Sequence, residues 1–380
     1  MTDCFSVFNA NIVTKSRNFI GSMQVENGVI QAIDEGSSSK ANAQNWAGDY
    51  LLPGFVELHT DNLERHLMPR PKVSWPAFQA LLSHDAEIAA SGITTVFDAL
   101  GVGDVDESAL RGMNMSGLLN CIDEAENAGV LRAEHKLHVR CELPAPNVVE
   151  LFSPFIDNPR VSVLSLMDHT PGQRQWTNVD HARTYYTGKK GWSHEKFDQI
   201  SLHSKELQQQ YAEPHRRFFV DYAKSRKITL ASHDDTTPIH VDEAVCSGVT
   251  LSEFPTTVVA AEAAREQHLH IIMGAPNVVR GGSHSGNVSA IELAKHHWLD
   301  ILSSDYVPSS LLDAAFTLKK KAGYSLSQAI ATISINPARA VGLMDRGELA
   351  LQKKADFSRV RLINDKPCVI SVWRDGKRVI

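Results

Sequence analysis

The chain has 380 residues, of which 43% are hydrophobic and 22% are charged, values typical of a globular protein that is large enough for one α/β domain with a small appendage. Its formal net charge of -6 argues against a nucleic-acid binder, which would carry a basic stripe, but permits an anionic substrate in a local basic pocket. No apolar run approaches the roughly 20 residues that span a bilayer, and the first residues lack the basic start of an export signal, so we expect a cytoplasmic protein without a membrane partner.

Short strand patterns separated by turns occupy both ends of the chain. Two β-rich ends that flank a larger domain most simply pair with each other. The sequence therefore predicts a small β-sandwich domain made of residues 1–50 and 347–380. The predicted strands of these ends are residues 5–13, 21–25, 29–33, 369–373 and 377–380.

An apolar strand follows the Pro53-Gly54 break and runs into His59 and Asp61. Residues i and i+2 of a strand point the same way, so these two side chains can bind one cation. A single His-x-Asp pair is weak evidence by itself, because most histidines are ordinary polar side chains.

Strand and helix patterns then alternate through residues 51–346. Helical patterns cover residues 76–91, 107–127 and 287–296, and glycine follows the first two. Alternating units with eight apolar strands imply a (β/α)8 TIM-like barrel, whose active site lies at the carboxyl ends of its strands. The eight predicted strands are residues 54–59, 93–100, 135–143, 161–169, 228–233, 249–254, 270–275 and 300–306.

Histidines and carboxylates gather at these strand ends, which the barrel makes neighbours. A divalent metal site, with one or two ions of Zn, Mn or Fe, needs such nitrogen and oxygen donors. The alternative is that each residue is a helix cap or a satisfied polar group, which fits one residue more readily than six together. The predicted metal ligands are His59, Asp61, Glu142, His169 and His233, with Asp305 as the catalytic residue; the strand ends also supply Asp168, Asp234, Asp235 and Glu253.

Basic residues lie in loops on the same predicted face of the barrel. Arginine and lysine neutralise phosphate oxygens, and the glycine-rich residues 281–286 offer backbone N–H groups before a helix, so a polyphosphate substrate is favoured. Each cation taken alone fits a solvated surface charge better than a phosphate contact, and the glycine-rich turn alone fits a plain loop equally well. The predicted substrate-binding residues are Arg65, Arg70, Lys72, Arg174, Arg280, Ser283 and His284.

Residues 170–214 form a long insertion after the fourth predicted strand. It carries several aromatic side chains, among them Trp176, Tyr185 and Trp192. A segment of this length is too long for a plain connection. We expect it to act as a lid.

Two groups of motifs resemble known families. Three features resemble the amidohydrolase superfamily. They are the segment Pro53-Gly54-Phe55 that leads into His59-x-Asp61, the aspartate Asp305 at the end of the eighth predicted strand, and the tail that begins at Asn336-Pro337-Ala338. More narrowly, five stretches are similar to the family of α-D-ribose 1-methylphosphonate 5-triphosphate diphosphatases of the carbon-phosphorus lyase pathway. These stretches are residues 57–63, 69–76, 164–175, 231–235 and 273–287.

The resemblance implies a metal-dependent barrel that hydrolyses the 5-triphosphate to a 5-phosphate and pyrophosphate. Two features depart from the superfamily. Its usual first motif is His-x-His, whereas Asp61 is the second residue of the motif in this chain. Its usual bridging ligand is a modified lysine on strand four, whereas Glu142 on the third predicted strand is the best candidate for a bridging ligand here. In the expected mechanism a divalent ion activates water, Asp305 accepts the proton, and the cations stabilise charge on the phosphates.

Two other functions stay open at this point. A deaminase or deacetylase acting on a C–N bond would use the same metal donors without a ring of cations, and a non-catalytic barrel would bind no metal. The expected partner is a small phosphorylated ribose phosphonate, with no nucleic acid and no membrane. The sequence leaves a homo-oligomer open.

Overall fold

The computed structural model describes residues 4–36, 43–70, 73–103, 115–283 and 286–380. The chain divides into two compact units. Unit 1 comprises residues 1–98, 117–136 and 273–380, and unit 2 comprises residues 99–116 and 137–272. This division differs from the predicted one into residues 51–346 and the two chain ends, which stays a prediction. Among the helices of the described ranges, not one has the length and apolar character needed to cross a membrane.

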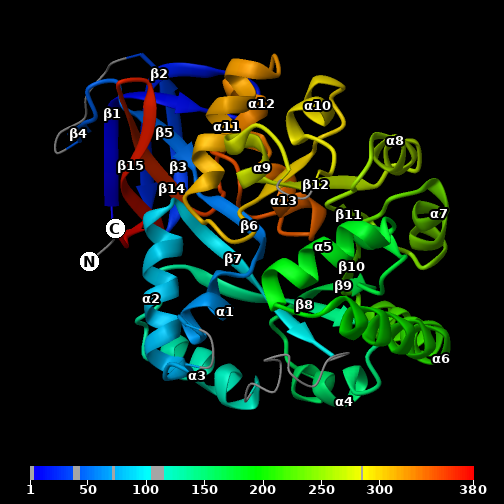
Figure 1. Ribbon diagram of the computed structural model, residues 1–380. Helices are drawn as coiled ribbons and strands as arrows, with labels where there is room; N and C mark the ends of the chain where they lie inside the picture. The colour runs from blue at the N-terminus through cyan, green and yellow to red at the C-terminus, as the bar shows by residue number, and fades with distance from the viewer. Residues whose placement is uncertain (1–3, 37–42, 71–72, 104–114, 284–285) are drawn as a thin grey trace. The chain divides into compact units, whose positions relative to one another are not determined.

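Eight parallel strands follow one another in chain order through a single sheet (Figure 1). Their side chains are almost entirely buried, as expected of parallel strands covered on both faces. Each overlaps a strand predicted from the sequence, which confirms the α/β barrel. The strands are β6 (Phe55–Thr60), β7 (Ile93–Val102), β8 (Glu134–Glu142), β9 (Val161–Met167), β10 (Thr229–His233), β11 (Leu251–Glu253), β12 (His270–Gly274) and β13 (Ile301–Ser303).

Within unit 1 the first strand of the barrel is joined to the last. Thr60 and Asp305 form a parallel bridge. The N–H of Asp305 donates to the carbonyl of His59 at 3.1 Å, and the N–H of Asp61 donates to the carbonyl of Asp305 at 2.7 Å. The segment with the predicted ligands of strand one is therefore fixed by its own backbone.

The helices lie where the sequence predicts them, with shorter ends. The predicted helix over 76–91 is α2, and Gly92 follows it at φ +91, a left-handed value that favours glycine. The start of the helix predicted over 107–127 lies outside the described residues. The helices are α1 (Asn62–Leu67), α2 (Ala77–Ala90), α3 (Met115–Asn127), α4 (Val148–Phe152), η1 (Ser153–Phe155), η2 (Arg174–Trp176), α5 (Val179–Lys190), α6 (His194–Arg226), α7 (Pro238–Cys246), α8 (Val258–Glu266), α9 (Ala275–Arg280), α10 (Ala290–Lys295), α11 (Ser310–Lys321), α12 (Leu326–Ala331) and α13 (Ile335–Ala340).

The two ends of the chain meet in a second sheet within unit 1. Strand β14 from the C-terminal end pairs with β5 from the N-terminal end, so the predicted pairing of the ends is present. Its core holds stacked aromatic rings, such as those of Phe357 and Trp373 at 4.9 Å between centroids. The strands are β1 (Cys4–Val13), β2 (Asn18–Glu26), β3 (Val29–Glu35), β4 (Gln44–Asn45), β5 (Tyr50–Pro53), β14 (Phe357–Ile363), β15 (Lys366–Arg374) and β16 (Lys377–Arg378).

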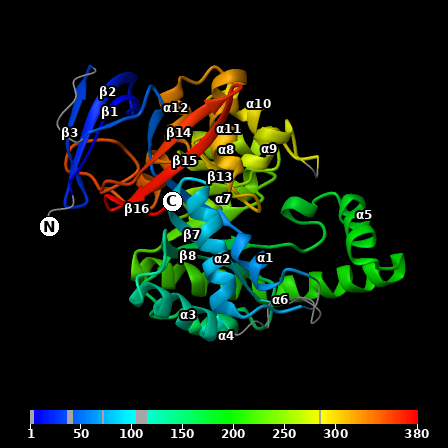
Figure 2. The same ribbon diagram turned by 90° about the vertical axis from the view of Figure 1, so that its left-hand side faces the viewer.

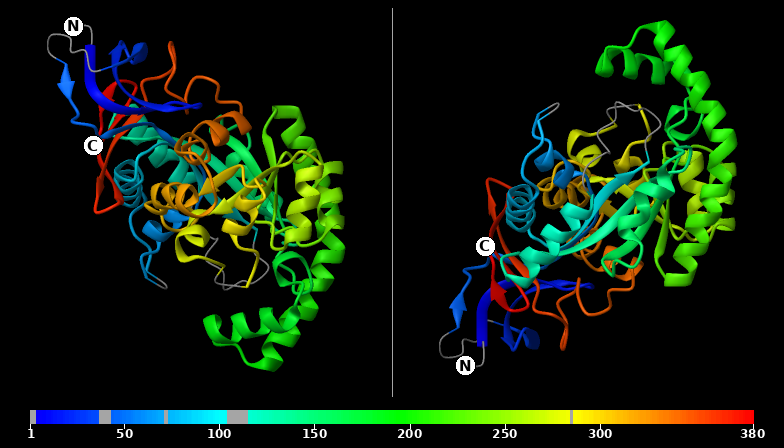
Figure 3. Two further views of the ribbon diagram at one scale, coloured as in Figure 1. Left: turned by 90° about the horizontal axis from the view of Figure 1, so that it is seen from above. Right: turned by 90° about the horizontal axis from the view of Figure 1, so that it is seen from below.

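The predicted insertion is helical and belongs to unit 2. Helix α6 continues through Pro214 to Arg226, so the segment merges into the barrel's own helix rather than ending at the proline. In unit 2, α6 extends beyond the strands and α5 folds back beside its first turns (Figures 2 and 3). Trp176, Ala182 and Phe197 form a small core there, and the rings of Tyr186 and Trp192 stack at 5.0 Å. A core of its own explains the length of the insertion.

Candidate functional site

The donors of the first and last strands come together in unit 1. His59, Asp61 and Asp305 each offer a ligand atom, and these three atoms lie within 4.8 Å of one another. The Nε2 atom of His59 lies 3.7 Å from the Oδ1 atom of Asp61. Asp305 has a left-handed φ of 55, which turns the chain directly after β13. The structure therefore brings together the three predicted residues of this unit.

Glu57 supports this group from inside the barrel wall. One carboxylate oxygen accepts the N–H of His59 at 2.6 Å, and the other accepts the N–H of Ser304 at 2.6 Å. Burial raises the pKa of Glu57 to about 7, although these two N–H groups favour its charged form. Glu57 is not among the residues predicted from the sequence, because a carboxylate inside an apolar strand has no local signature.

In unit 2, Glu142 at the end of β8 holds His169. Its Oε1 atom accepts the N–H of His169 at 2.8 Å, and its Oε2 atom lies 2.5 Å from the ring Nδ1. A carboxylate only accepts, so Nδ1 carries the proton and Nε2 is the nitrogen that can bind a metal. The sequence predicts Glu142 as a bridging ligand; in the structure it orients a histidine, and the bridging role stays a prediction.

His233 at the end of β10 has the same kind of partner. Its Nδ1 atom lies 3.4 Å from the Oε2 atom of Glu253, which is buried and also accepts the hydroxyl of Ser165 at 2.8 Å. The Nε2 atoms of His233 and His169 lie 3.6 and 4.0 Å from the Oδ2 atom of Asp234. Imidazoles whose other nitrogen meets a carboxylate are typical of metal centres.

Asp234 joins His169 and His233 as a third donor, within the same 4.8 Å limit. Asp234 lies at a predicted strand end but is not among the predicted ligands. Its φ of 55 explains the omission, because a left-handed residue breaks the alternation that would point adjacent side chains apart. The structure thus adds Asp234 to the predicted set.

Arg174 lies inside unit 2, where only 4% of its surface is exposed to solvent. Its guanidinium donates to Asp235, to Glu243 at 2.8 Å and to the carbonyl of His233 at 3.2 Å. Arg174 therefore holds the turn that carries His233 and Asp234. Its predicted contact with substrate stays a prediction.

The other predicted cations have separate surroundings in unit 1. Arg65 lies on α1 and pairs with Glu87 at 3.1 Å. Arg70 is exposed and forms an isolated antiparallel β-bridge with Val73. Arg280 is the exposed last residue of α9. Ser283 is half-buried in the turn that follows. Lys72 and His284 lie outside the described residues.

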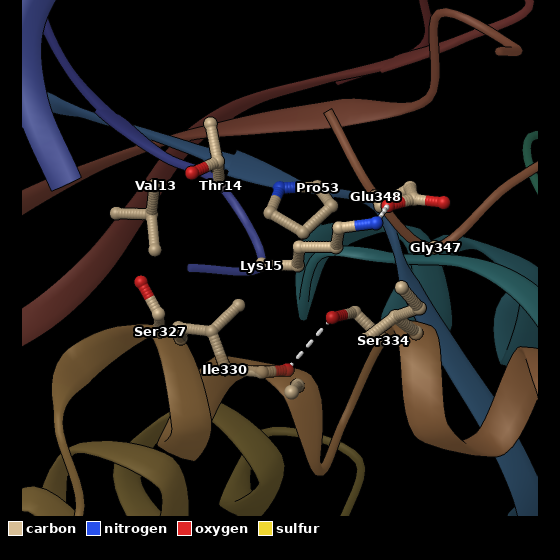
Figure 4. Close-up of a pocket in the computed structure, with 11 residues that line it drawn as sticks. Val13, Thr14, Lys15, Pro53, Ser327, Ile330, Ser334, Gly347 and Glu348 are labelled. Atoms are coloured by element: carbon tan, nitrogen blue, oxygen red, sulfur yellow. Dashed lines mark hydrogen bonds and ion pairs between the residues drawn. The ribbon is translucent and has the colours of Figure 1, made fainter. Parts of the chain in front are cut away.

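A small pocket lies in unit 1 (Figure 4). Lys15, Ser327 and Glu348 are among its lining residues, and Lys15 and Glu348 pair at 3.6 Å. None of the predicted metal ligands or substrate cations that the structure describes lines it. It is therefore not a candidate active site.

The donors of the two units fit a divalent ion. Each group combines imidazole nitrogen with carboxylate oxygen, the mixture that Zn, Mn and Fe accept. The two histidines of unit 2 are oriented by carboxylates, as metal-binding histidines commonly are. The residues therefore suit the metal expected from the sequence.

Comparisons with known proteins place the chain in a family. The model of the amidohydrolase family matches residues 221–379. Over 373 residues, which cover 98% of this chain and 99% of the relative, the chain is 46% identical to alpha-D-ribose 1-methylphosphonate 5-triphosphate diphosphatase from Escherichia coli (strain K12). The chain belongs to the amidohydrolase family.

Solved structures agree with this amidohydrolase fold. N-acetyl-D-glucosamine-6-phosphate deacetylase from Mycobacterium smegmatis matches with a TM-score of 0.65 and 15% identity, covering 99% of this chain and 100% of the other. 5-Methylcytosine deaminase from Klebsiella pneumoniae matches with a TM-score of 0.63 and 14% identity, covering 99% and 97%. At sequence identities this low, these similarities show the fold of the chain and not its substrate.

Proposed function

We propose that the protein hydrolyses alpha-D-ribose 1-methylphosphonate 5-triphosphate to the 5-phosphate and pyrophosphate, in phosphonate catabolism in the cytoplasm. The observation that carries this proposal is the 46% identity with a diphosphatase over nearly the whole of both chains. The donor groups at the strand ends supply the chemistry that such a hydrolase needs. The deaminase and deacetylase alternative has only fold-level support from remote structures.

One or two divalent ions of Zn, Mn or Fe are proposed as the cofactor. His169, His233 and Asp234 would hold an ion in unit 2, and His59 and Asp61 would hold an ion in unit 1. An ion bound by such donors supplies a Lewis acid and lowers the pKa of a coordinated water. Glu142 and Glu253 would fix the tautomer of the two histidines, leaving each Nε2 atom as the donor.

Asp305 is proposed as the base of the reaction. Its backbone bonds to both neighbours of Thr60, and its carboxylate lies near the donor atoms of His59 and Asp61. Water adds to a phosphorus of the triphosphate, the P–O–P bond breaks, pyrophosphate or the 5-phosphate leaves, and Asp305 accepts the proton from the water.

The phosphate chain is proposed to meet the cations of the loops. Arg280 and Ser283 lie at the end of α9 and just after it, and Arg280 is exposed rather than buried. Arg65 and Arg70 come from α1 and the loop after it. Lys72 and His284, outside the described residues, and Arg174 stay predicted contacts. Arginine donates to two phosphate oxygens at once, which suits a polyphosphate.

The purified protein is expected to release pyrophosphate from the 5-triphosphate, and a chelator is expected to abolish the release. Restoring a divalent ion should restore turnover, because the ion activates the attacking water. An enzyme-coupled pyrophosphate assay measures the rate, with a cyclic amide and an N-acetylated sugar as controls for C–N hydrolysis. Turnover of either control at a higher rate would replace the diphosphatase with the C–N hydrolase.

Arg280→Ala is expected to lower kcat/KM for the triphosphate by roughly ten- to a hundredfold, the effect of losing a charge-assisted hydrogen bond worth about 1.5–3 kcal/mol. A shorter analogue with one phosphate should show a smaller loss, because it offers fewer oxygens to the cation. Lys377→Ala, which removes an exposed cation from β16, is the control. Equal losses with both substrates would remove Arg280 from the substrate site.

A further inference from the structure

A chain of buried polar side chains crosses unit 1 behind the segment that carries His59 and Asp61. It links α1, α2, β7 and the start of β8, and it contains none of the predicted ligands. Each of its residues is at most 3% exposed. Its members are Asn62, His84, Asp85, Asp98 and His135.

The distances in this group are those of hydrogen bonds. Asp98 lies 2.7 Å from the Nε2 atom of His84 and 2.8 Å from the Nδ1 atom of His135. Donors held about 2.0–2.1 Å from a tetrahedral zinc ion would lie roughly 3.3 Å apart. In this structure, hydrogen bonds therefore join His84 and His135 to Asp98.

The charges of the network balance. Burial lowers the pKa of His135, but Asp98 and Asp85 outweigh burial and raise it to about 9, so its ring is an imidazolium. Burial raises the pKa of Asp98, but His135 and His84 outweigh burial and hold it well below its usual range. Asp85 also accepts the guanidinium of Arg132 at 3.0 Å. Each buried carboxylate thus has a cation as its partner.

His84 differs from His135 because burial lowers its pKa, which keeps the ring neutral near pH 7. Its proton must lie on Nε2, which faces Asp98, so Nδ1 is an acceptor. The side-chain amide of Asn62 donates to this Nδ1 atom at 3.1 Å and to Glu87 at 3.1 Å. The network therefore fixes both amide hydrogens of Asn62 on residues of α2.

Asn62 is the first residue of α1, and Asp61 directly precedes it. Helix α1 has six residues, too few to be stable without outside contacts. An aspartate has a short side chain, so its carboxylate reaches a metal only where the backbone places it. The backbone bond from Asp61 to Asp305 holds this residue from one side, and the anchoring of Asn62 to α2 holds the helix that follows it.

We propose that Asn62 and His84 are positioning residues that hold the Asp61 carboxylate in the geometry required to bind a metal. The proposal rests on the metal-dependent function proposed above. In this proposal the buried network fixes the helix that directly follows Asp61.

Asn62→Asp tests the proposal without a change in side-chain size. It removes both donated hydrogens and places a carboxylate against Glu87 and the acceptor nitrogen of His84. We expect the affinity for Zn or Mn to fall roughly 10- to 100-fold, as when a residue that supports a metal ligand is lost. Competition with a chromophoric chelator measures the affinity without any substrate. At saturating metal, KM should stay within about twofold of wild type, because the variant affects the ion and not the substrate contacts.

Two variants of His84 keep the test decisive if Asn62→Asp folds poorly. The amide introduced by His84→Gln can still accept a hydrogen bond from Asn62 and donate one to Asp98, so the metal affinity of this variant should stay near that of the wild type. His84→Leu can do neither, so its metal affinity should fall. Ile88→Ala makes a cavity on the same helix and is the control for stability alone. Wild-type affinity in Asn62→Asp and His84→Leu, or an equal loss in Ile88→Ala at the same melting temperature, would overturn the proposal. A wild-type protein that binds metal but releases no pyrophosphate would overturn the proposed substrate and leave this result standing.

Discussion

Arg174→Ala is expected to lower the free energy of unfolding by about 3–5 kcal/mol, the usual cost of removing one partner of a buried ion pair. Asp235 is fully buried, and the guanidinium of Arg174 is its cationic partner. Without it, Asp235 remains buried as an unpaired charge, and the carbonyl of His233 also loses a donor. Equilibrium denaturation in urea measures the loss.

Arg217→Ala is the matched control for this variant. Arg217 also pairs with a carboxylate, Glu213, but its side chain is 75% exposed. Its removal should change the free energy by less than about 0.5 kcal/mol, because water screens exposed pairs. If Arg174→Ala were as stable as this control and only raised KM for the triphosphate, Arg174 would be a substrate contact, as the sequence analysis predicts.

The barrel could be predicted from the sequence because its strands are buried on both faces. Every residue of β6 and β7 is buried, so the sequence shows unbroken apolar and β-branched runs between helical patterns. Strand β14 lacked this signal. Arg359 and Arg361 alternate along it and bind Asp49, a partner more than 300 residues away that no local pattern reveals.

The grouping of the donor side chains could be predicted where strand geometry is regular and not where it is broken; that these donors bind a metal stays a prediction. His59 and Asp61 share a side of the chain because they are two residues apart. Asp234 comes directly after His233, and only its left-handed backbone brings the two together. The carboxylates that orient the histidines could not be assigned, since a sequence shows that Glu142 and Glu253 end strands but not which nitrogen each one meets.

The buried network of unit 1 had no sequence signal at all. His84, Asp98 and His135 are separated by 14 and 37 residues and belong to three elements. Each taken alone resembles an ordinary polar residue in a helix or strand. The substrate, in contrast, was indicated by long motifs shared with a family, and the 46% identity over nearly the whole chain agrees with that indication.

Glu142→Gln and His169→Ala together separate an orienting carboxylate from a metal ligand. Loss of the His169 ligand should reduce kcat at least about a thousandfold, because several kcal/mol of stabilisation by the ion are lost. The amide oxygen introduced by Glu142→Gln can still accept the N–H of His169, but the side chain no longer fixes the proton on Nδ1. We expect this variant to lose only about 10- to 100-fold in metal affinity or kcat.

Metal content per chain, measured by mass spectrometry on the same samples, makes the comparison decisive. An orienting Glu142 predicts that Glu142→Gln, once saturated with metal, holds as many ions as wild type. A bridging Glu142, as the sequence predicts, would instead give a loss of kcat equal to that of His169→Ala and one fewer ion per chain. The second result would place Glu142 between two ions, and the contact with His169 seen here would then belong to the protein before metal binds.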